Sequence, residues 1–260
     1  MSSYVTAVWQ CRYFWWSLVK MDLRTRYRRS ILGLGWSLLH PIAMTTILCF
    51  VFSEVFKIAV EDFGPYLLAG LATWNYVSTV TIQGCQCFFQ GEAYIRQHPA
   101  PLAVYPLRTA LGGTVHFLIA LVVVIGLTGY FKGFENPACL ICLVPASALL
   151  FVLGWSLAVL AGFANVLFQD TQHLSEIGFQ IVFYATPVMY PASLLESSRF
   201  GWILQYNPVV PLLQLVREPI LQGKVPDIQT YSTAGLIVFL AACAAGATLA
   251  RLQRRLIFHL

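Results

Sequence analysis

Two cysteine pairs have the residue type and spacing of a metal site. They are Cys85-x-Cys87 and Cys139-x-x-Cys142. A structural zinc site needs four ligands, and neither pair is matched by a second pair or by a histidine at zinc spacing. We therefore interpret these cysteines as small apolar residues of helices, and we expect no metal site in this chain.

The motifs of the common hydrolytic enzymes do not occur. The one Gly-Lys pair, Gly223-Lys224, has Glu218 where a phosphate-binding loop of the form G-x-x-x-x-G-K-[ST] needs its first glycine. Neither H-E-x-x-H nor G-x-S-x-G is present. We expect no catalytic residue and no ATP hydrolysis by the chain itself. His173, close to Asp170, is the one acid/base pair that keeps an enzymatic alternative open.

A few polar side chains lie within long uncharged stretches, where they are costly and invite a functional interpretation. They are His40, Asn75, Gln83, His116 and Asn165. For His116 and Asn165 the simpler expectation is a hydrogen bond to a carbonyl of a neighbouring helix. The chain has no series of acidic residues within these stretches, as an ion-coupled pump would need, so the energy for any transport must come from elsewhere.

The composition indicates that these residues are positioned by membrane-spanning helices. Charged residues make up 10% of the 260 residues and hydrophobic ones 58%, whereas ordinary globular domains are about 25% charged. A spanning helix needs about 20 mostly apolar residues. The sequence predicts an all-α integral membrane protein of one domain, 1–260, with six spans. The predicted spans are 31–56, 64–89, 107–131, 137–167, 177–192 and 229–250.

Two further segments are predicted to contact the membrane without crossing it. In 4–30, polar and apolar residues alternate at helical spacing before a basic stretch, which predicts an amphipathic interface helix. In 193–227, an uncharged run is interrupted by Pro208 and Pro211, which predicts a re-entrant helical pair on the external side. Basic residues gather at both ends of the chain and in the loop after the second span, so both termini are predicted cytoplasmic. The positive charge is then expected to contact anionic lipid headgroups, and no nucleic-acid partner is expected.

Four stretches, taken in order, resemble the membrane subunit of a bacterial ABC-2 exporter of the O-antigen, capsule and teichoic-acid polysaccharide group. They are Asp22 to Gly33 with Trp36 and Pro41; Tyr94 to Pro99 through Pro106; Asn165 to Asp170; and Thr186 to Pro191 with Trp202, Asn207-Pro208, Arg217 and Gly223. Gln169 departs from the pattern, which usually has Arg-Asp at this point. The resemblance covers almost the whole chain.

The resemblance implies a homodimer bound to two copies of a separate ATPase subunit, which would hold the ATP and magnesium while this chain carries no cofactor. The cargo would be a lipid-linked polysaccharide, and the location the bacterial cytoplasmic (inner) membrane. The basic stretch and the loop after the second span would receive the motion of the ATPase, with the prolines stiffening that loop. The expected coupling residues are Arg24, Arg26, Arg28, Arg29, Tyr94, Ile95, Arg96, His98 and Pro99.

Flat aromatic rings suit a path for sugars, because sugars present apolar C–H faces beside their hydroxyl groups. The candidate path residues are Trp36, Phe50, Phe52, Phe56, Phe179, Phe183, Tyr184 and Tyr190. For each ring, packing against lipid is the alternative. In the re-entrant region we single out Asn207, Pro208, Arg217 and Glu218, and expect the last two to bind each other or a phosphate of the outer leaflet.

Two other functions remain open from the sequence. An ABC-2 permease for a lipid or a small amphiphilic drug would use the same fold. An intramembrane enzyme that acts on lipid-linked sugars would use His173 and Asp170 as its acid/base pair.

Overall fold

The computed structural model describes residues 2–26, 28, 35–97, 100–196, 199 and 201–256. Within these ranges the chain is helical, with turns and short extended linkers but no β-strand. The helices are α1 (Ser2–Gln10), α2 (Arg12–Arg26), α3 (Trp36–Phe56), α4 (Val60–Cys85), α5 (Cys87–Gln97), α6 (Val104–Phe131), the 3₁₀ turn η2 (Pro137–Cys142), α7 (Leu143–Leu167), α8 (Thr171–Ala185), α9 (Ser193–Glu196), α10 (Trp202–Tyr206), α11 (Val209–Leu221) and α12 (Ile228–Leu256).

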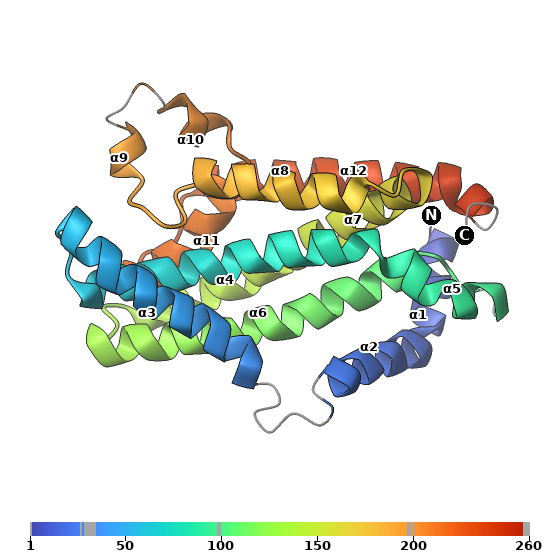
Figure 1. Ribbon diagram of the computed structural model, residues 1–260, viewed down its shortest axis with the longest axis horizontal. Helices are drawn as coiled ribbons and strands as arrows, with labels where there is room; N and C mark the ends of the chain where they lie inside the picture. The colour runs from blue at the N-terminus through green and yellow to red at the C-terminus, as the bar shows by residue number, and fades with distance from the viewer. Residues whose placement is uncertain are drawn as a thin grey trace.

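The long helices α3, α4, α6, α7, α8 and α12 run along the long axis of the molecule (Figure 1). The short helices α9 and α10 lie at one end, which we call the α10 end, and α1 and α5 lie at the other, the α5 end. The chain begins at the α5 end, and α12 finishes there (Figure 1). The first helix and the end of the last helix therefore lie at the same end of the bundle.

Local sequence explains where several helices begin and end. Lys57 adopts a left-handed conformation with a φ of 53° and ends α3. The next helix, α4, opens with Glu61 and Asp62, whose carboxylates suit the positive end of the helix dipole. Asn136 precedes η2 and accepts a 3.3 Å hydrogen bond from the amide of Ala138.

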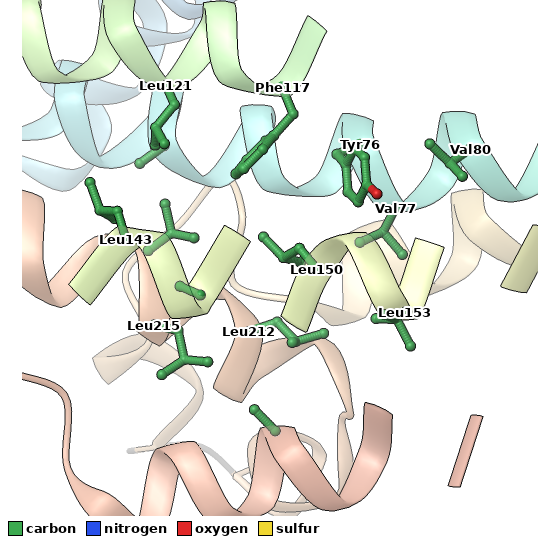
Figure 2. Close-up of a cluster of buried hydrophobic side chains, with 14 of the residues drawn as sticks. Tyr76, Val77, Val80, Phe117, Leu121, Leu143, Leu150, Leu153, Leu212 and Leu215 are labelled. Atoms are coloured by element: carbon green, nitrogen blue, oxygen red, sulfur yellow. The ribbon is translucent and has the colours of Figure 1, made fainter. Parts of the chain in front are cut away.

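The core of the bundle lies where α4, α6, α7 and α11 meet (Figure 2). Phe117 and Leu121 of α6 point toward Leu143 and Leu150 of α7, and Leu212 of α11 closes the cluster from the other side. Leu150 and Leu212 are each 1% exposed. This apolar contact fixes the relative positions of the four helices.

The contact between α4 and α7 depends on residues with little or no side chain. A Cβ at Gly84 of α4 would lie 2.6 Å from the Cα of Ala158 on α7, and one at Gly154 would lie 2.5 Å from the hydroxyl of Tyr76. Small residues of this kind let two helix backbones approach closely, which is how membrane helices gain packing energy without a hydrophobic driving force. The two helices therefore have little freedom to slide.

Three helices are long and apolar enough to span a membrane, by length and composition, among the described residues. They are Val104–Phe131, Pro137–Leu167 and Ile228–Gln253, which overlap the third, fourth and sixth predicted spans. In α3 only Pro41–Phe56 forms an apolar helix, and that is shorter than a span. The second predicted span corresponds to α4, which has 26 residues but begins at Val60 and carries two acidic residues in its first turn.

The fifth predicted span, 177–192, differs most from the structure. The helix there is α8, which has 15 residues, begins at Thr171 and ends at Ala185 just before Pro187. At 1.5 Å per residue it is about 22 Å long, less than the roughly 30 Å of a bilayer core. The prediction began after Glu176 because the uncharged run begins there, whereas the helix already starts among the polar residues before it.

The two segments predicted to lie at the membrane surface are also helical. The N-terminal one is two helices that meet at Cys11, not one, and Leu18 and Val19 of the second are buried while Trp9 and Tyr13 are exposed. The segment 193–227 contains α9, α10 and α11. Of these, only α11 has buried residues along its length.

We predict that Gly84→Ala destabilises the bundle, because its methyl group would meet the backbone of Ala158 and force α4 and α7 apart. Overpacking of this kind costs about 1–3 kcal/mol. The melting temperature of the purified protein in detergent measures it. Gly126→Ala on α6 is the matched control, because a Cβ at Gly126 meets nothing within 4 Å. Equal melting temperatures for the two variants would show that the α4–α7 contact is looser than described.

Candidate functional site

The described coupling residues lie on α2 and α5 or directly after α2, in the half of the molecule that holds the α5 end (Figure 1), but they differ in exposure. Arg24 and Arg28 are exposed near the end of α2. Arg96 of α5 is exposed and forms a 2.8 Å ion pair with Glu92, one helical turn earlier. These side chains are accessible to a partner. The Arg26 side chain, Arg29, His98 and Pro99 lie outside the described residues.

The other two expected coupling residues pack inward. Ile95 is 9% exposed and belongs to an apolar cluster with Tyr105 and Leu256. Tyr94 contacts Phe14 of α2 edge to face, with ring centroids 5.8 Å apart. They attach α5 to its neighbours and do not present a surface. Through these contacts, a displacement of α5 would also displace α2 and α6.

An ion pair that the sequence did not suggest joins α2 to α6. The guanidinium of Arg108 donates through Nε and Nη2 to the two carboxylate oxygens of Asp22. The Arg108 side chain is 10% exposed and that of Asp22 is 40% exposed. A separation of 86 residues carries no local signal, so the sequence did not predict this pair. The pair anchors the end of α2 to the first turns of α6.

An aromatic groove lies between α3, α4 and α8. We use this name for a cavity of about 610 Å³ lined by Met44, Leu48, Trp74, Asn75, Ser78, Glu176, Phe179, Gln180, Phe183, Tyr184, Met189 and their neighbours. Trp74 packs against Phe179 and Phe183, with centroids 5.8 and 5.4 Å apart. The groove thus offers ring faces beside the amides of Asn75 and Gln180.

Of the expected path residues, Phe179, Phe183 and Tyr184 line this groove. Trp74 was not predicted, although an aromatic residue next to the polar Asn75 inside an uncharged stretch is a signal that could have found it. Glu176 is the one charged residue among those described in the lining. Flat apolar faces with amides and little fixed charge suit sugars, which need both C–H contacts and hydrogen bonds.

The remaining expected path residues are placed elsewhere. Phe52 and Phe56 stack on each other at 5.5 Å and pack against the start of α4. Phe50 is 83% exposed and does not belong to the groove lining. Trp36 lines a different cavity, beside α4 and α6. Tyr190 donates a 3.0 Å hydrogen bond to the carbonyl of Tyr184, so it fixes the turn after α8.

Arg217 clamps the turn that follows α8. Its Nη1 and Nη2 donate to the carbonyls of Pro187 and Val188 at 2.7 and 2.9 Å, and its guanidinium lies 3.7 Å from the ring centroid of Tyr66. The residue is 8% exposed. A Cβ at Gly70 would collide with the guanidinium, so that glycine provides the space. Arg217 therefore holds the end of α8 against α4.

This placement differs from the expectation for Arg217 and Glu218. No ion pair joins the two in the described structure, and Arg217 is 8% exposed with its Nη1 and Nη2 directed at two backbone carbonyls. Adjacent residues of a helix point about 100° apart, so direct pairing was geometrically unfavourable. Asn207 donates to the hydroxyl of Thr186 at 2.8 Å and accepts from the amide of Val209, which places Pro208 at the start of α11.

The alternative chemical sites are not assembled. His173 is 3.6 Å from Glu176, and its side chain is 75% exposed, so it does not meet Asp170 as an acid/base pair. Cys139 donates to the carbonyl of Gly223 at 3.0 Å. No three metal-ligating side chains come together in the part of the chain that is described. Asn165 donates to the carbonyl of Cys85 at 2.9 Å, which confirms the expected hydrogen bond between helices.

We predict that Asp22→Asn weakens the attachment of α2, because Arg108 would remain buried without its carboxylate. The expected loss of unfolding free energy is about 2–3 kcal/mol, reduced from the fully buried case by the exposure of Asp22. The control is Glu92→Gln, whose partner Arg96 is exposed and whose loss should cost less than about 1 kcal/mol. Thermal melting of both variants measures the difference. An Asp22→Asn variant as stable as the control would contradict this role.

Comparison with known proteins agrees with this arrangement. Residues 13–221 match the family model described as ABC-2 type transporter. The chain is 24% identical over 209 residues to an O-antigen export system permease protein RfbA of Klebsiella pneumoniae, with 79% of each chain covered. It is 27% identical over 228 residues to the protein of that name from Myxococcus xanthus, with 86% of each covered.

A third relative carries a different cargo. The polysialic acid transport protein KpsM of Escherichia coli is 21% identical over 216 residues, which cover 81% of this chain and 82% of that protein. The family match extends over most of the chain and includes α2 through α11. The chain therefore belongs to the ABC-2 type transporter family.

Proposed function

We propose that this chain is the permease subunit of a transporter that exports a lipid-linked polysaccharide, of the O-antigen or capsule type, across the bacterial cytoplasmic membrane. The observation that carries the proposal is the aromatic groove, where Trp74, Phe179, Phe183 and Tyr184 stand beside two amides. Sugars can slide over such rings, because stacking is tolerant of position and no strong charge holds them in one place. The names of the relatives support the same class of cargo.

The groove explains why two copies of the chain would be needed. It is bounded by α3, α4 and α8 of one chain and is open on its remaining side. A second copy related by two-fold symmetry would face it with an identical groove and enclose a conduit. The homodimer and the six predicted spans are thus both part of the proposal.

Energy would come from a separate ATPase subunit acting on the α5 end. Members of the ABC-2 family work with ATPase subunits, and this end presents Arg24, Arg28 and Arg96 to a partner. Since Tyr94 and Ile95 attach α5 to α2 and α6, binding of ATP to the partner would bias the relative positions of these helices. The α5 end would then be cytoplasmic and the α10 end external.

A permease for a lipid or a small amphiphilic drug is the second candidate. One observation favours it: a cavity of about 610 Å³ is within the range of small-molecule pockets, roughly 300–1,000 Å³. The enzymatic alternative has no comparable support, because His173 and Asp170 are not brought together.

We predict that Phe183→Leu slows export while the protein stays folded, because leucine keeps the apolar volume but removes the ring face. Loss of one stacking contact, about 0.5–1.5 kcal/mol, lowers the export rate roughly twofold to tenfold. Surface polysaccharide is measured by time course in cells with equal amounts of protein. Phe50→Leu, on an exposed ring outside the groove, is the control. Normal surface polysaccharide together with increased drug sensitivity would favour the second candidate.

We predict that Arg96→Glu abolishes coupling to the ATPase without unfolding the chain, because the residue is exposed and its loss leaves no buried charge unpaired. Copurification with the ATPase and the ATPase-dependent export are both expected to fall at least about tenfold. Arg199→Glu, on an exposed residue at the α10 end, should change neither. If copurification and export persist in Arg96→Glu, α5 does not dock on the ATPase.

A further inference from the structure

A second cavity system, distinct from the aromatic groove, lies between α2, α4 and α6. It consists of two cavities of about 460 and 360 Å³ that share Gln83 and His116 in their linings. The first reaches Asp22 and Gln90 at the α5 end, and the second reaches Trp36 at the start of α3. We call the pair the inner groove. It touches the aromatic groove only where both contact Pro41 and Asn75.

The inner groove is lined by a row of polar side chains on α4. Asn75, Thr79 and Gln83 recur every four residues and so share one face of the helix. Gln90, on α5, continues the lining toward the α5 end. Gln83 and Gln90 are exposed and Asn75 is half-buried, and no hydrogen bond within the described protein engages their side-chain amides. Where α4 lies at membrane depth, the amides of Asn75 and Gln83 need a polar ligand or water.

The facing helix α6 leaves room for a ligand. A Cβ at Gly112, which lines the inner groove, would meet no atom within 4 Å. Its neighbour Gly113 is different, because a Cβ there would collide with Val80 of α4. One glycine therefore serves helix packing, and the other keeps space open beside Thr109 and His116.

The charges of the inner groove decide which kind of ligand it suits. Asp22 and Arg108 are the charged residues in its described lining, and they form a two-point ion pair with each other. A phosphate would have to displace the carboxylate of Asp22 to reach Arg108. Amides and hydroxyl groups, in contrast, offer both donors and acceptors to the hydroxyl groups of an uncharged sugar.

We infer that the inner groove binds the uncharged sugar headgroup of an amphiphile, with the apolar tail lying in the adjacent lipid. Trp36, 54% exposed at the mouth, gives the sugar a ring face or the tail an apolar contact. The inference rests on the proposed function, since it assigns to the inner groove the sugars nearest the lipid end of the cargo before they reach the aromatic groove. Phosphate recognition would be left to other residues.

The test measures protection of a cysteine in the inner groove. Gly112→Cys is placed in a chain whose partly or fully exposed cysteines, Cys11, Cys142 and Cys243, are changed to serine. The protein is reconstituted in phosphatidylcholine nanodiscs, and maleimide labelling is followed with increasing dodecyl maltoside or dodecylphosphocholine, both below solubilising concentrations. The two probes have the same tail, but one carries sugars and the other a phosphate.

Dodecyl maltoside is expected to slow labelling of Gly112→Cys by about tenfold, as two or three neutral hydrogen bonds imply, and dodecylphosphocholine is expected to have little effect. Adding Gln83→Leu should remove most of the protection. Gly126→Cys on α6, outside the groove, is the control and should be labelled at the same rate throughout. Equal protection by both probes, stronger protection by the phosphocholine or no protection would overturn the inference.

Export in cells separates this inference from the proposed function. A Cβ at Gly112 meets nothing within 4 Å, so Gly112→Leu would place its side chain in the inner groove and should reduce surface polysaccharide, whereas Gly126→Leu should not. If Gly112→Leu exports normally while Phe183→Leu does not, the inner groove is not a sugar site and the proposed function stands. If both export normally, the proposed function fails as well.

Discussion

The arrangement depends on the central position of α4 and on its close contact with α7. Gly84 of α4 lies directly against the backbone of Ala158, and Gly154 of α7 leaves room for the ring of Tyr76 from α4. With one face fixed against α7, α4 presents Trp74 and Asn75 to α8 on another side and Gln83 to α6 on a third. The core, the aromatic groove and the inner groove therefore share one helix as a common wall. A displacement of α4 would alter all three at once.

Charged residues are few in this chain, and two of them, Arg108 and Arg217, are buried arginines that join separate segments. Arg108 has a carboxylate partner and joins α2 to the first turns of α6. Arg217 has no carboxylate partner in the described structure and binds two carbonyls and the face of Tyr66 near the α10 end. Each ties a peripheral segment, the helix α2 or the turn after α8, to the long helices. Burial of a cation is costly, so these contacts are specific to one arrangement of the helices. The two ends of the molecule are in this way attached to the same set of long helices.

Sequence reasoning predicted the class of fold and the family, because composition and uncharged length report directly on lipid as the solvent. It predicted part of the aromatic groove, since Phe179, Phe183 and Tyr184 follow one another at helical spacing. It misplaced the limits of α8, because a helix can begin among polar residues, and it gave Arg217 the wrong partner, because a carbonyl acceptor has no signature in sequence. The position of Trp74 in the groove and the pairing of Asp22 with Arg108 result from contacts between segments that are distant in the sequence. Such contacts depend on how the helices pack, which the sequence of one chain does not state.

The central claim is that sugars pass along the aromatic groove, and capture of the cargo there tests it most directly. A photoreactive amino acid is placed at Tyr184, which is 62% exposed in the groove, and at Tyr130, which is 84% exposed outside it. Cells that make the polysaccharide are illuminated during export, and the purified chain is analysed with a glycan-specific stain. The account predicts a ladder of glycan adducts at position 184 and none at position 130. A chain that supports export but yields no adduct at 184 would contradict it.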